Sequence, residues 1–163
     1  MRQLLFLSLH PMSTTTVQIR IKNKKAWYEY LLMEEFTAGI VLTGTEIKSI
    51  RDGKVNLTDS YCTFSGDELF VVNLHIAEYK YGNQFNHEPK RPRKLLLNRR
   101  ELRKIQGKAK DKGVTVVPVE LFINDDGLAK LMIYIARGKK TYDKRETLKN
   151  KDQKRQIERR HEE

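Results

Sequence analysis

The chain has 163 residues, the length of one domain, and its apolar runs, such as Leu4–Leu7, are far shorter than the ~20 residues of a membrane span. Its 32 Lys and Arg outnumber 21 Asp and Glu, and the formal net charge of +11 indicates nucleic acid as the first class of partner and an acidic membrane surface as the second. The single Cys62 excludes an internal disulfide and a Cys-based zinc site, as expected in a reducing cytoplasm.

The first 15 residues contain a short apolar stretch but lack the small-residue cleavage pattern of a signal peptide. We expect residues 1–15 to be a disordered leader, or to precede a true start at Met12; a signal peptide is the less favoured alternative. The globular domain is then expected over residues 16–137, and a basic tail over residues 138–163.

The N-terminal half of the domain shows mainly strand patterns. Polar and β-branched residues alternate over residues 17–23, and the aromatic residues in 27–32 favour a strand, although helical and strand patterns overlap there. Residues 39–42 form a short β-type run. Residues 45–51 predict a short helix with Thr45 near its N-cap.

The next segments combine a hairpin, a loop and a cationic helix. Residues 60–75 predict a hairpin that turns at Ser65-Gly66-Asp67, and residues 79–93 are rich enough in Gly, Asn and Pro to predict an exposed loop. Residues 98–110 predict an amphipathic helix whose outer face is overwhelmingly cationic.

Residues 114–123 and 128–136 have the clearest strand patterns, and a strong turn over residues 124–127 joins them. Pro118 lacks an amide donor, which predicts an edge or a bulge at that point. About six short strands with two or three peripheral helices indicate a mainly β fold, a small closed antiparallel barrel.

The segment after Gly138 cannot bury a helix face, because Leu148 and Ile157 are its only aliphatic residues. We therefore expect residues 141–163 to be disordered in the free protein. A polyanion that held the segment helical would meet a stripe of cations. These are Lys144, Lys151, Arg155 and Arg159.

Positive charge is concentrated in two segments. Residues 88–112 contain 11 Lys and Arg against 3 Asp and Glu, and residues 137–163 contain 11 against 6, so the rest of the chain has a net charge of −2. Clustering favours a phosphate backbone, because neutralising several phosphates together releases condensed counterions. Two solvated charged helices are the alternative.

No pattern of residues indicates catalysis or a metal. None of the four histidines has the spacing of metal ligands, and no glycine-rich phosphate loop is present. The adjacent Glu34 and Glu35 would point to opposite faces of a strand and could not converge on one substrate atom. We predict a non-enzymatic protein without cofactor or metal; an RNA-processing enzyme is an alternative.

Aromatic residues lie beside cations at two places. Tyr79, Tyr81 and Phe85 precede the basic residues from Lys90, and Tyr142 lies among four cations. Unpaired bases stack on such rings while cations hold phosphates. For the first three rings a packed loop is an equal alternative, whereas the tail offers Tyr142 nothing to pack against.

Three blocks of sequence closely resemble one family. They are GTEIKSIRDGKVNLTDSY (44–61), NHEPKRPRKLLLNRREL (86–102) and ARGKKTYDKRETLK (136–149), and they resemble the small protein B family of bacterial transfer-messenger RNA (tmRNA)-binding proteins. The resemblance extends over about residues 17–160. It implies an oligonucleotide/oligosaccharide-binding (OB)-like barrel that binds tmRNA at its tRNA-like domain and delivers it to stalled ribosomes for trans-translation.

The same resemblance implies two sets of site residues. The RNA contacts carried over from the family are Lys90, Arg91, Arg93, Lys94, Leu96 and Asn98. The residues of the tail entrance, which would lie at the decoding centre, are Gly138, Lys139, Lys140, Tyr142, Asp143, Lys144 and Arg145. There the aromatic ring would stack on a base of small-subunit ribosomal RNA, and the tail beyond would be helical in the empty mRNA channel.

The chain departs from the family pattern at Trp27-Tyr28, where relatives commonly have a basic residue and His, and at Thr37, where Glu is frequent. We assign no RNA contact to these residues. The expected protein is a cytoplasmic monomer with tmRNA and the ribosome as partners and no membrane. A general OB-fold binder of ribosomal RNA, similar to an initiation factor, is the alternative.

Overall fold

The computed structural model describes residues 19–160, and within the last helix it leaves out the side chains of residues 141–143, 147 and 156–160. The leader predicted for residues 1–15 lies outside this range. No helix among the described residues has both the length and the apolar character that crossing a membrane requires.

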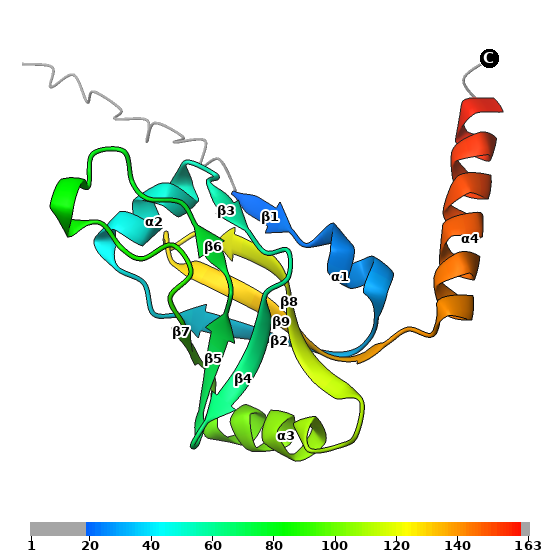
Figure 1. The fold of residues 1–163 in the computed structure, drawn as a ribbon, viewed down its shortest axis with the longest axis horizontal. Helices are drawn as coiled ribbons and strands as arrows, with labels where there is room; N and C mark the ends of the chain where they lie inside the picture. The colour runs from blue at the N-terminus through cyan, green and yellow to red at the C-terminus, as the bar shows by residue number, and fades with distance from the viewer. Residues whose placement is uncertain (1–18, 161–163) are drawn as a thin grey trace, which may run out of the picture.

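The described chain consists of nine strands, four α-helices and one short 3₁₀ helix (Figure 1). The strands are β1 (Arg20–Lys22), β2 (Tyr30–Ile40), β3 (Val55–Asn56), β4 (Tyr61–Ser65), β5 (Glu68–Val72), β6 (His75–Ile76), β7 (Arg93–Leu96), β8 (Val114–Ile123) and β9 (Ala129–Gly138). The helices are α1 (Lys24–Glu29), α2 (Gly44–Arg51), η1 (Asn83–Phe85), α3 (Arg99–Ala109) and α4 (Thr141–Arg160).

Six antiparallel strands close into a ring. The sheet runs β1-β8-β4-β5-β7-β2-β9, and β8 also pairs with β9, so that the ring is complete and β1 adds to the edge of β8. This arrangement confirms the predicted mainly β, OB-like barrel with peripheral helices. The predicted irregularity at Pro118 is present as a register shift between Pro118 and Glu120.

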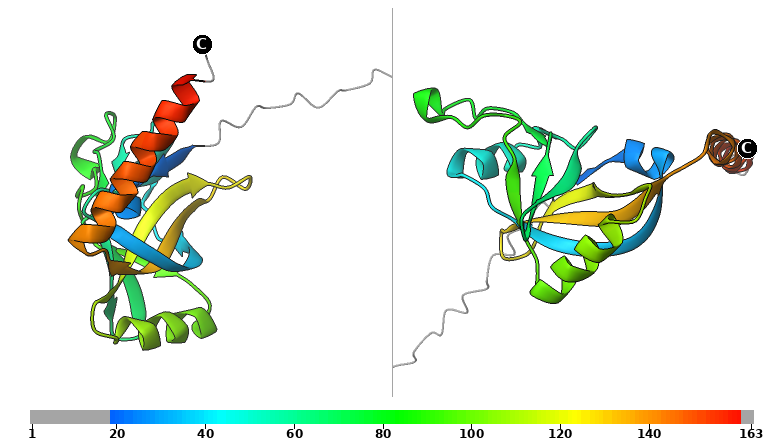
Figure 2. Two further views of the ribbon diagram at one scale, coloured as in Figure 1. Left: turned by 90° about the vertical axis from the view of Figure 1, so that its right-hand side faces the viewer. Right: turned by 60° about the horizontal axis from the view of Figure 1, so that its bottom comes forward.

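The barrel is filled by alternate residues of its strands. On β9, Leu131, Ile133 and Ile135 are fully buried, as expected when every second side chain of a strand points inward. Helix α3 lies across one end of the barrel (Figures 1 and 2), and its Ile105 is fully buried there. Helix α3 therefore both closes the core and carries its cationic face to the surface.

The strand predicted over residues 27–32 is wrong for its first three residues, which belong to α1. Buried Asn23 selects the helix: its side-chain oxygen accepts a hydrogen bond from the amide of Ala26 at 3.1 Å. Its amide group donates to the carbonyl oxygens of Leu57 and Pro118, each at 3.1 Å. These contacts are distant in sequence, so local pattern did not indicate them.

The remaining elements follow the sequence prediction with a few differences. The hairpin, the cationic helix and the two long strands are present, whereas the short run predicted at residues 39–42 contributes only its first two residues to the end of the longer β2. Helix α2 is capped by Thr43 rather than Thr45. Strand β7, between the predicted loop and helix, was not predicted.

Helix α4 projects away from the barrel beside α1 (Figures 1 and 2). Leu148 is exposed on it, in agreement with the absence of an apolar face in this segment. The expected disorder of this tail concerns the free protein in solution and stays a prediction.

Candidate nucleic-acid interface

A buried ionic cluster joins α2 to the segment that leads into β7. The carboxylate of Glu46 accepts hydrogen bonds from Arg91 Nε at 2.8 Å, Arg91 Nη2 at 2.6 Å and Arg93 Nε at 2.8 Å. The amide of Thr43 donates a further bond to it at 2.7 Å. Burial alone would raise the pKa of Glu46, but these hydrogen bonds outweigh burial and lower the pKa to about 2.

Arg93 has no solvent-exposed surface, and its remaining donors are satisfied within the protein. Its Nη1 donates to the carbonyl oxygens of Leu74 at 2.6 Å and Arg91 at 3.1 Å, and its Nη2 donates to that of Pro89 at 3.1 Å. A guanidinium in this position cannot reach a phosphate. The expectation that Arg93 contacts RNA is therefore corrected: Arg93 holds the loop before β7 in place.

Arg91 is only partly available to a ligand. Besides its bonds to Glu46, it donates through Nη1 to the carbonyl oxygen of Pro92 and through Nη2 to that of Val41, each at 3.4 Å. The neighbouring Lys90 is exposed. Of the two residues, Lys90 is the better placed to meet a phosphate.

Lys94 and Leu96 line a groove of about 500 Å³, and Asn98 lies in the chain between two of its lining residues, Leu97 and Arg99. Lys94 forms an ion pair with Glu68 at the surface, and Leu96 is 53% exposed. The exposed Asn98 caps α3, and its amide donates to Glu101 at 2.9 Å. The structure thus brings two of the six predicted RNA contacts into one groove between β7 and α3.

Two further cations on this groove were missed as site residues. Arg99 and Arg103, both exposed on α3, line the groove opposite β7. The signal was present in the cationic face of the predicted helix, but no pattern placed that face against the preceding strand. We define the β7–α3 groove by its lining residues Lys94, Leu96, Arg99 and Arg103; Asp67 and Glu68 also line it.

Other cations of α3 are neutralised within the protein. Lys104 and Lys108 both bind the carboxylate of Glu34 on β2, Lys108 at 2.6 Å, and these hydrogen bonds lower the pKa of Glu34. The ammonium group of Lys104 also lies 5.8 Å from the ring centre of Phe36. The available charge of α3 is therefore concentrated toward its first turns.

The tail entrance lies at the opposite end of β2 from the β7–α3 groove. Gly138 pairs with Tyr30 at the start of β2, whereas Leu96 pairs with Gly39 near its end. Nine residues of strand correspond to about 30 Å. The two predicted sets of site residues thus form two separate surfaces.

The root of the tail is tied to α1. The amide of Lys139 donates to the carbonyl oxygen of Glu29 at 2.8 Å, and its ammonium group donates to that of Trp27 at 3.1 Å. Lys140 and Arg145 are exposed, and Lys144 is partly exposed. The side chains of Tyr142 and Asp143 lie outside the described part of the chain.

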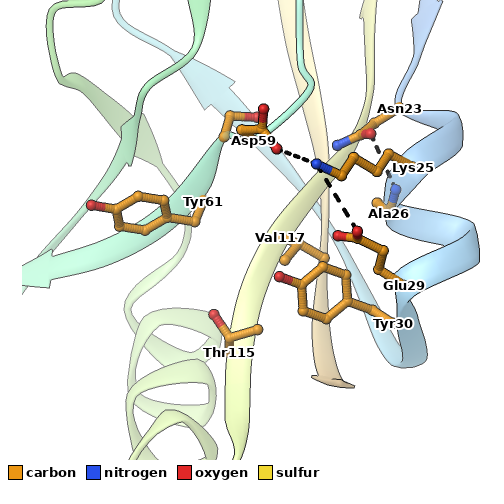
Figure 3. A pocket seen from close by; sticks show the side chains of 10 residues that line it. Asn23, Lys25, Ala26, Glu29, Tyr30, Asp59, Tyr61, Thr115 and Val117 are labelled. Carbon is orange, nitrogen blue, oxygen red and sulfur yellow. Dashed lines mark hydrogen bonds and ion pairs between the residues drawn. The ribbon is translucent and has the colours of Figure 1, made fainter. Parts of the chain in front are cut away.

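A polar cleft of about 280 Å³ separates α1 from β8 and the loop before β4 (Figure 3). Lys25 spans it: the ammonium group lies 2.5 Å from Asp59 and 4.0 Å from Glu29, and the hydrogen bond to Asp59 raises the pKa of Lys25. Tyr30 and Tyr61 line the same cleft. Because its cation is already paired, this cleft fixes α1 rather than offering a site for an anion.

The aromatic loop before β7 contains both packed and exposed rings. Tyr79 packs edge-on against Tyr81 with ring centres 5.6 Å apart, and the Asn86 side chain makes two hydrogen bonds to the backbone of Tyr79. A Cβ at Gly82 would lie only 2.7 Å from the Asn86 amide, so glycine is needed there. Phe85 is 82% exposed at the tip.

Among the side chains that the structure describes, no group of three His, Cys, Asp or Glu residues could hold a metal ion. The geometry instead shows cations and exposed apolar groups on the outside of a closed barrel. Such surfaces suit a nucleic-acid backbone and its unpaired bases.

Comparison with known proteins identifies the family. The family model described as SmpB protein matches residues 20–163. The chain belongs to the SmpB family. This result confirms the resemblance found in the three sequence blocks.

Relatives within the SmpB family share most of their length with this chain. The SsrA-binding protein of Flavobacterium psychrophilum is 55% identical over 141 residues, which cover 86% of this chain and 94% of the relative. That of Bacteroides thetaiotaomicron is 60% identical over 139 residues, which cover 85% and 93%. A chain of a solved structure, described as "tmRNA-SmpB: a journey to the center of the bacterial ribosome", has a TM-score of 0.66 and 45% identity over 76% of this chain and 86% of its own.

Proposed function

We propose that this SmpB-family protein is an RNA-binding adaptor of ribosome rescue, which binds tmRNA and delivers it to stalled ribosomes for trans-translation. The observation that carries this function is the separation of two cationic surfaces by the length of β2, one in the β7–α3 groove and one at the tail entrance. An adaptor must hold one RNA while it engages a second partner, and two separate surfaces meet that requirement. The relatives named SsrA-binding proteins support this proposal.

In this proposal the β7–α3 groove binds the tRNA-like domain of tmRNA. Exposed Lys90 and the groove residues Lys94, Arg99 and Arg103 neutralise phosphates, Lys94 in exchange for its ion pair with Glu68. Exposed Leu96 packs against a sugar or base, and the exposed Asn98 donates through its side-chain amide. Arg91 and Arg93 act as positioning residues through Glu46. No chemical step is needed, so the protein is not an enzyme.

The tail entrance engages the ribosome. Gly138, Lys139 and Lys140 lead into the decoding centre, where the ring of Tyr142 stacks on a base and Asp143, Lys144 and Arg145 make polar contacts. Residues beyond Arg145 line up as a cationic helix in the empty mRNA channel, whose phosphates stabilise it. The protein acts as a monomer in the cytoplasm, where ribosomes translate.

A competition experiment tests this function. At matched salt, the full chain should bind a tRNA-like fragment of tmRNA more tightly than bulk tRNA, because shape and unpaired bases add to the common phosphate attraction. Equal competition by both RNAs would favour the alternative, a general OB-fold binder of ribosomal RNA. Isolation of one long RNA with a tRNA-like end together with the protein from cells would support the adaptor.

A further inference from the structure

Trp27 is the only tryptophan of the chain, and 52% of its surface is exposed. It lies on α1. Its carbonyl oxygen accepts a hydrogen bond from Lys139, at the root of the tail. A large apolar ring exposed on a single-domain protein suggests a contact surface. Neither the β7–α3 groove nor the residues of the predicted tail entrance include it.

The indole ring packs against the barrel on one side, and its backbone is anchored. It packs edge-on against Tyr134 of β9, with ring centres 6.1 Å apart and planes inclined by 60°, and the Tyr134 hydroxyl donates to Glu35. Asn23 caps the start of α1, and Lys139 binds the carbonyl oxygen of Trp27 itself. Because the ring is already ordered, a ligand that stacks on it would lose little conformational entropy.

The charges around Trp27 favour RNA as the ligand. Three exposed cations lie close to Trp27 in the chain or to the Lys139 that binds its carbonyl oxygen: Lys24 on α1, and Arg137 and Lys140 on either side of Lys139. The acidic side chains nearby are engaged within the protein, Glu29 with Lys25 and Glu35 with Tyr134. An exposed ring among cations is complementary to a base and its phosphates, whereas an apolar protein surface would leave these cations without partners.

The position of Trp27 decides which RNA it meets. The start of β2 lies about 30 Å along the strand from its pairing with β7, so Trp27 cannot share a nucleotide with the β7–α3 groove. Trp27 is instead attached to the root of the tail, because Lys139 forms hydrogen bonds with the backbone of α1. Its ligand should therefore belong to the particle that the tail enters.

We propose that the indole of Trp27 is a stacking platform for an unpaired base of small-subunit ribosomal RNA, with phosphates of the same strand held by Lys24, Arg137 and Lys140. This inference rests on the proposed function, since it requires the tail to enter the ribosome. It adds a second aromatic contact, independent of Tyr142.

The single tryptophan allows a direct test. Full-length protein in which Trp27 is replaced by 5-hydroxytryptophan, which is excited at longer wavelengths than the subunit's own tryptophans, should show a change in fluorescence on titration with small ribosomal subunits, and none on titration with the tRNA-like fragment alone. An unchanged signal at saturating subunits would overturn the proposal. A change produced by the tRNA-like fragment alone would also overturn it, because the base would then belong to the other RNA.

Substitutions separate stacking from simple apolar contact. Trp27→Leu keeps an apolar side chain but no π face, and it should weaken binding of the protein to small subunits about 5-fold or more. Trp27→Phe should restore most of the affinity. The matched control is Leu31→Ala, which removes a side chain that is 56% exposed near the start of β2 and should leave subunit binding unchanged.

The outcomes keep the two proposals distinguishable. If Trp27→Leu and Leu31→Ala weaken binding equally, or if Trp27→Leu binds as the parent does, the surface is not a stacking platform. Binding of the tRNA-like fragment should be the same in all of these variants. Loss of preference for that fragment in the unmodified protein would overturn the proposed function instead.

Discussion

The Glu46 carboxylate and the Arg93 guanidinium lie 2.8 Å apart, and neither side chain is exposed to solvent. A charge in this position is tolerable only while its partner is present. Glu46→Gln should therefore destabilise the protein by about 3 kcal/mol, since it leaves a buried cation without its anion. Chemical denaturation measures the free energy of unfolding. Glu68→Gln, at the surface pair with Lys94, is the control and should cost less than about 1 kcal/mol; an equal loss in both variants would contradict the assignment.

The same carboxylate predicts the stability of the protein in acid. Because the pKa of Glu46 falls to about 2 in the folded state, the ion pairs contribute fully above the ordinary Glu pKa of about 4.3 and are lost as pH falls toward 2. The free energy of unfolding should decline through that window. In Glu46→Gln this part of the decline should be absent, and a curve parallel to that of the parent protein would refute the prediction.

Cations in the β7–α3 groove should determine the salt dependence of RNA binding. Arg103→Ala should reduce the slope of log K against log salt by about 1, because one phosphate contact is lost. Lys108→Ala on the same helix removes a cation that Glu34 already neutralises, and it should change the slope little. Titrations of the tRNA-like fragment at several salt concentrations measure both. A larger change of slope in Lys108→Ala than in Arg103→Ala would show that the RNA binds nearer the end of α3.

The tail should matter on the ribosome more than for tmRNA. Truncation after Lys140 keeps the hydrogen bonds between Lys139 and α1 but removes the segment proposed for the mRNA channel. Affinity for the tRNA-like fragment should stay within about 2-fold, because the β7–α3 groove is untouched. Peptide tagging on stalled ribosomes in a purified translation system should be abolished. Strong loss of RNA binding would show that the tail holds tmRNA as well.

The position of Arg93 shows what sequence patterns could and could not provide. Residues 93–96 lie between a loop and a helix, and four residues are too few for a clear periodicity. Once β7 is recognised, alternation puts Arg93 on the same inward face as Leu95, and Lys94 and Leu96 on the outer face. The cationic character of this segment and the family were predictable from the sequence. The direction of each side chain could be predicted only once β7 was known to be a strand.

Trp27 illustrates the second limit. Its aromatic neighbours favoured a strand, yet α1 forms because Asn23 reaches carbonyl groups more than 30 residues away in sequence. The long strands β8 and β9 were predictable because each has a sustained pattern and a strong turn joins them. A short element such as α1, which depends on hydrogen bonds to residues far away in the sequence, gives no comparable local signal.

The closed ring also constrains the distance over which this protein can work. Strand β2 is bonded along one side to β9 and near its end to β7, so it can neither stretch nor slide without breaking the barrel. The interval between the two surfaces proposed to face RNA is thus as stiff as the hydrogen-bonded sheet itself. Two RNA molecules that bind these surfaces at the same time are therefore held at a fixed distance. Any flexibility in the complex must come from the RNA or from the tail.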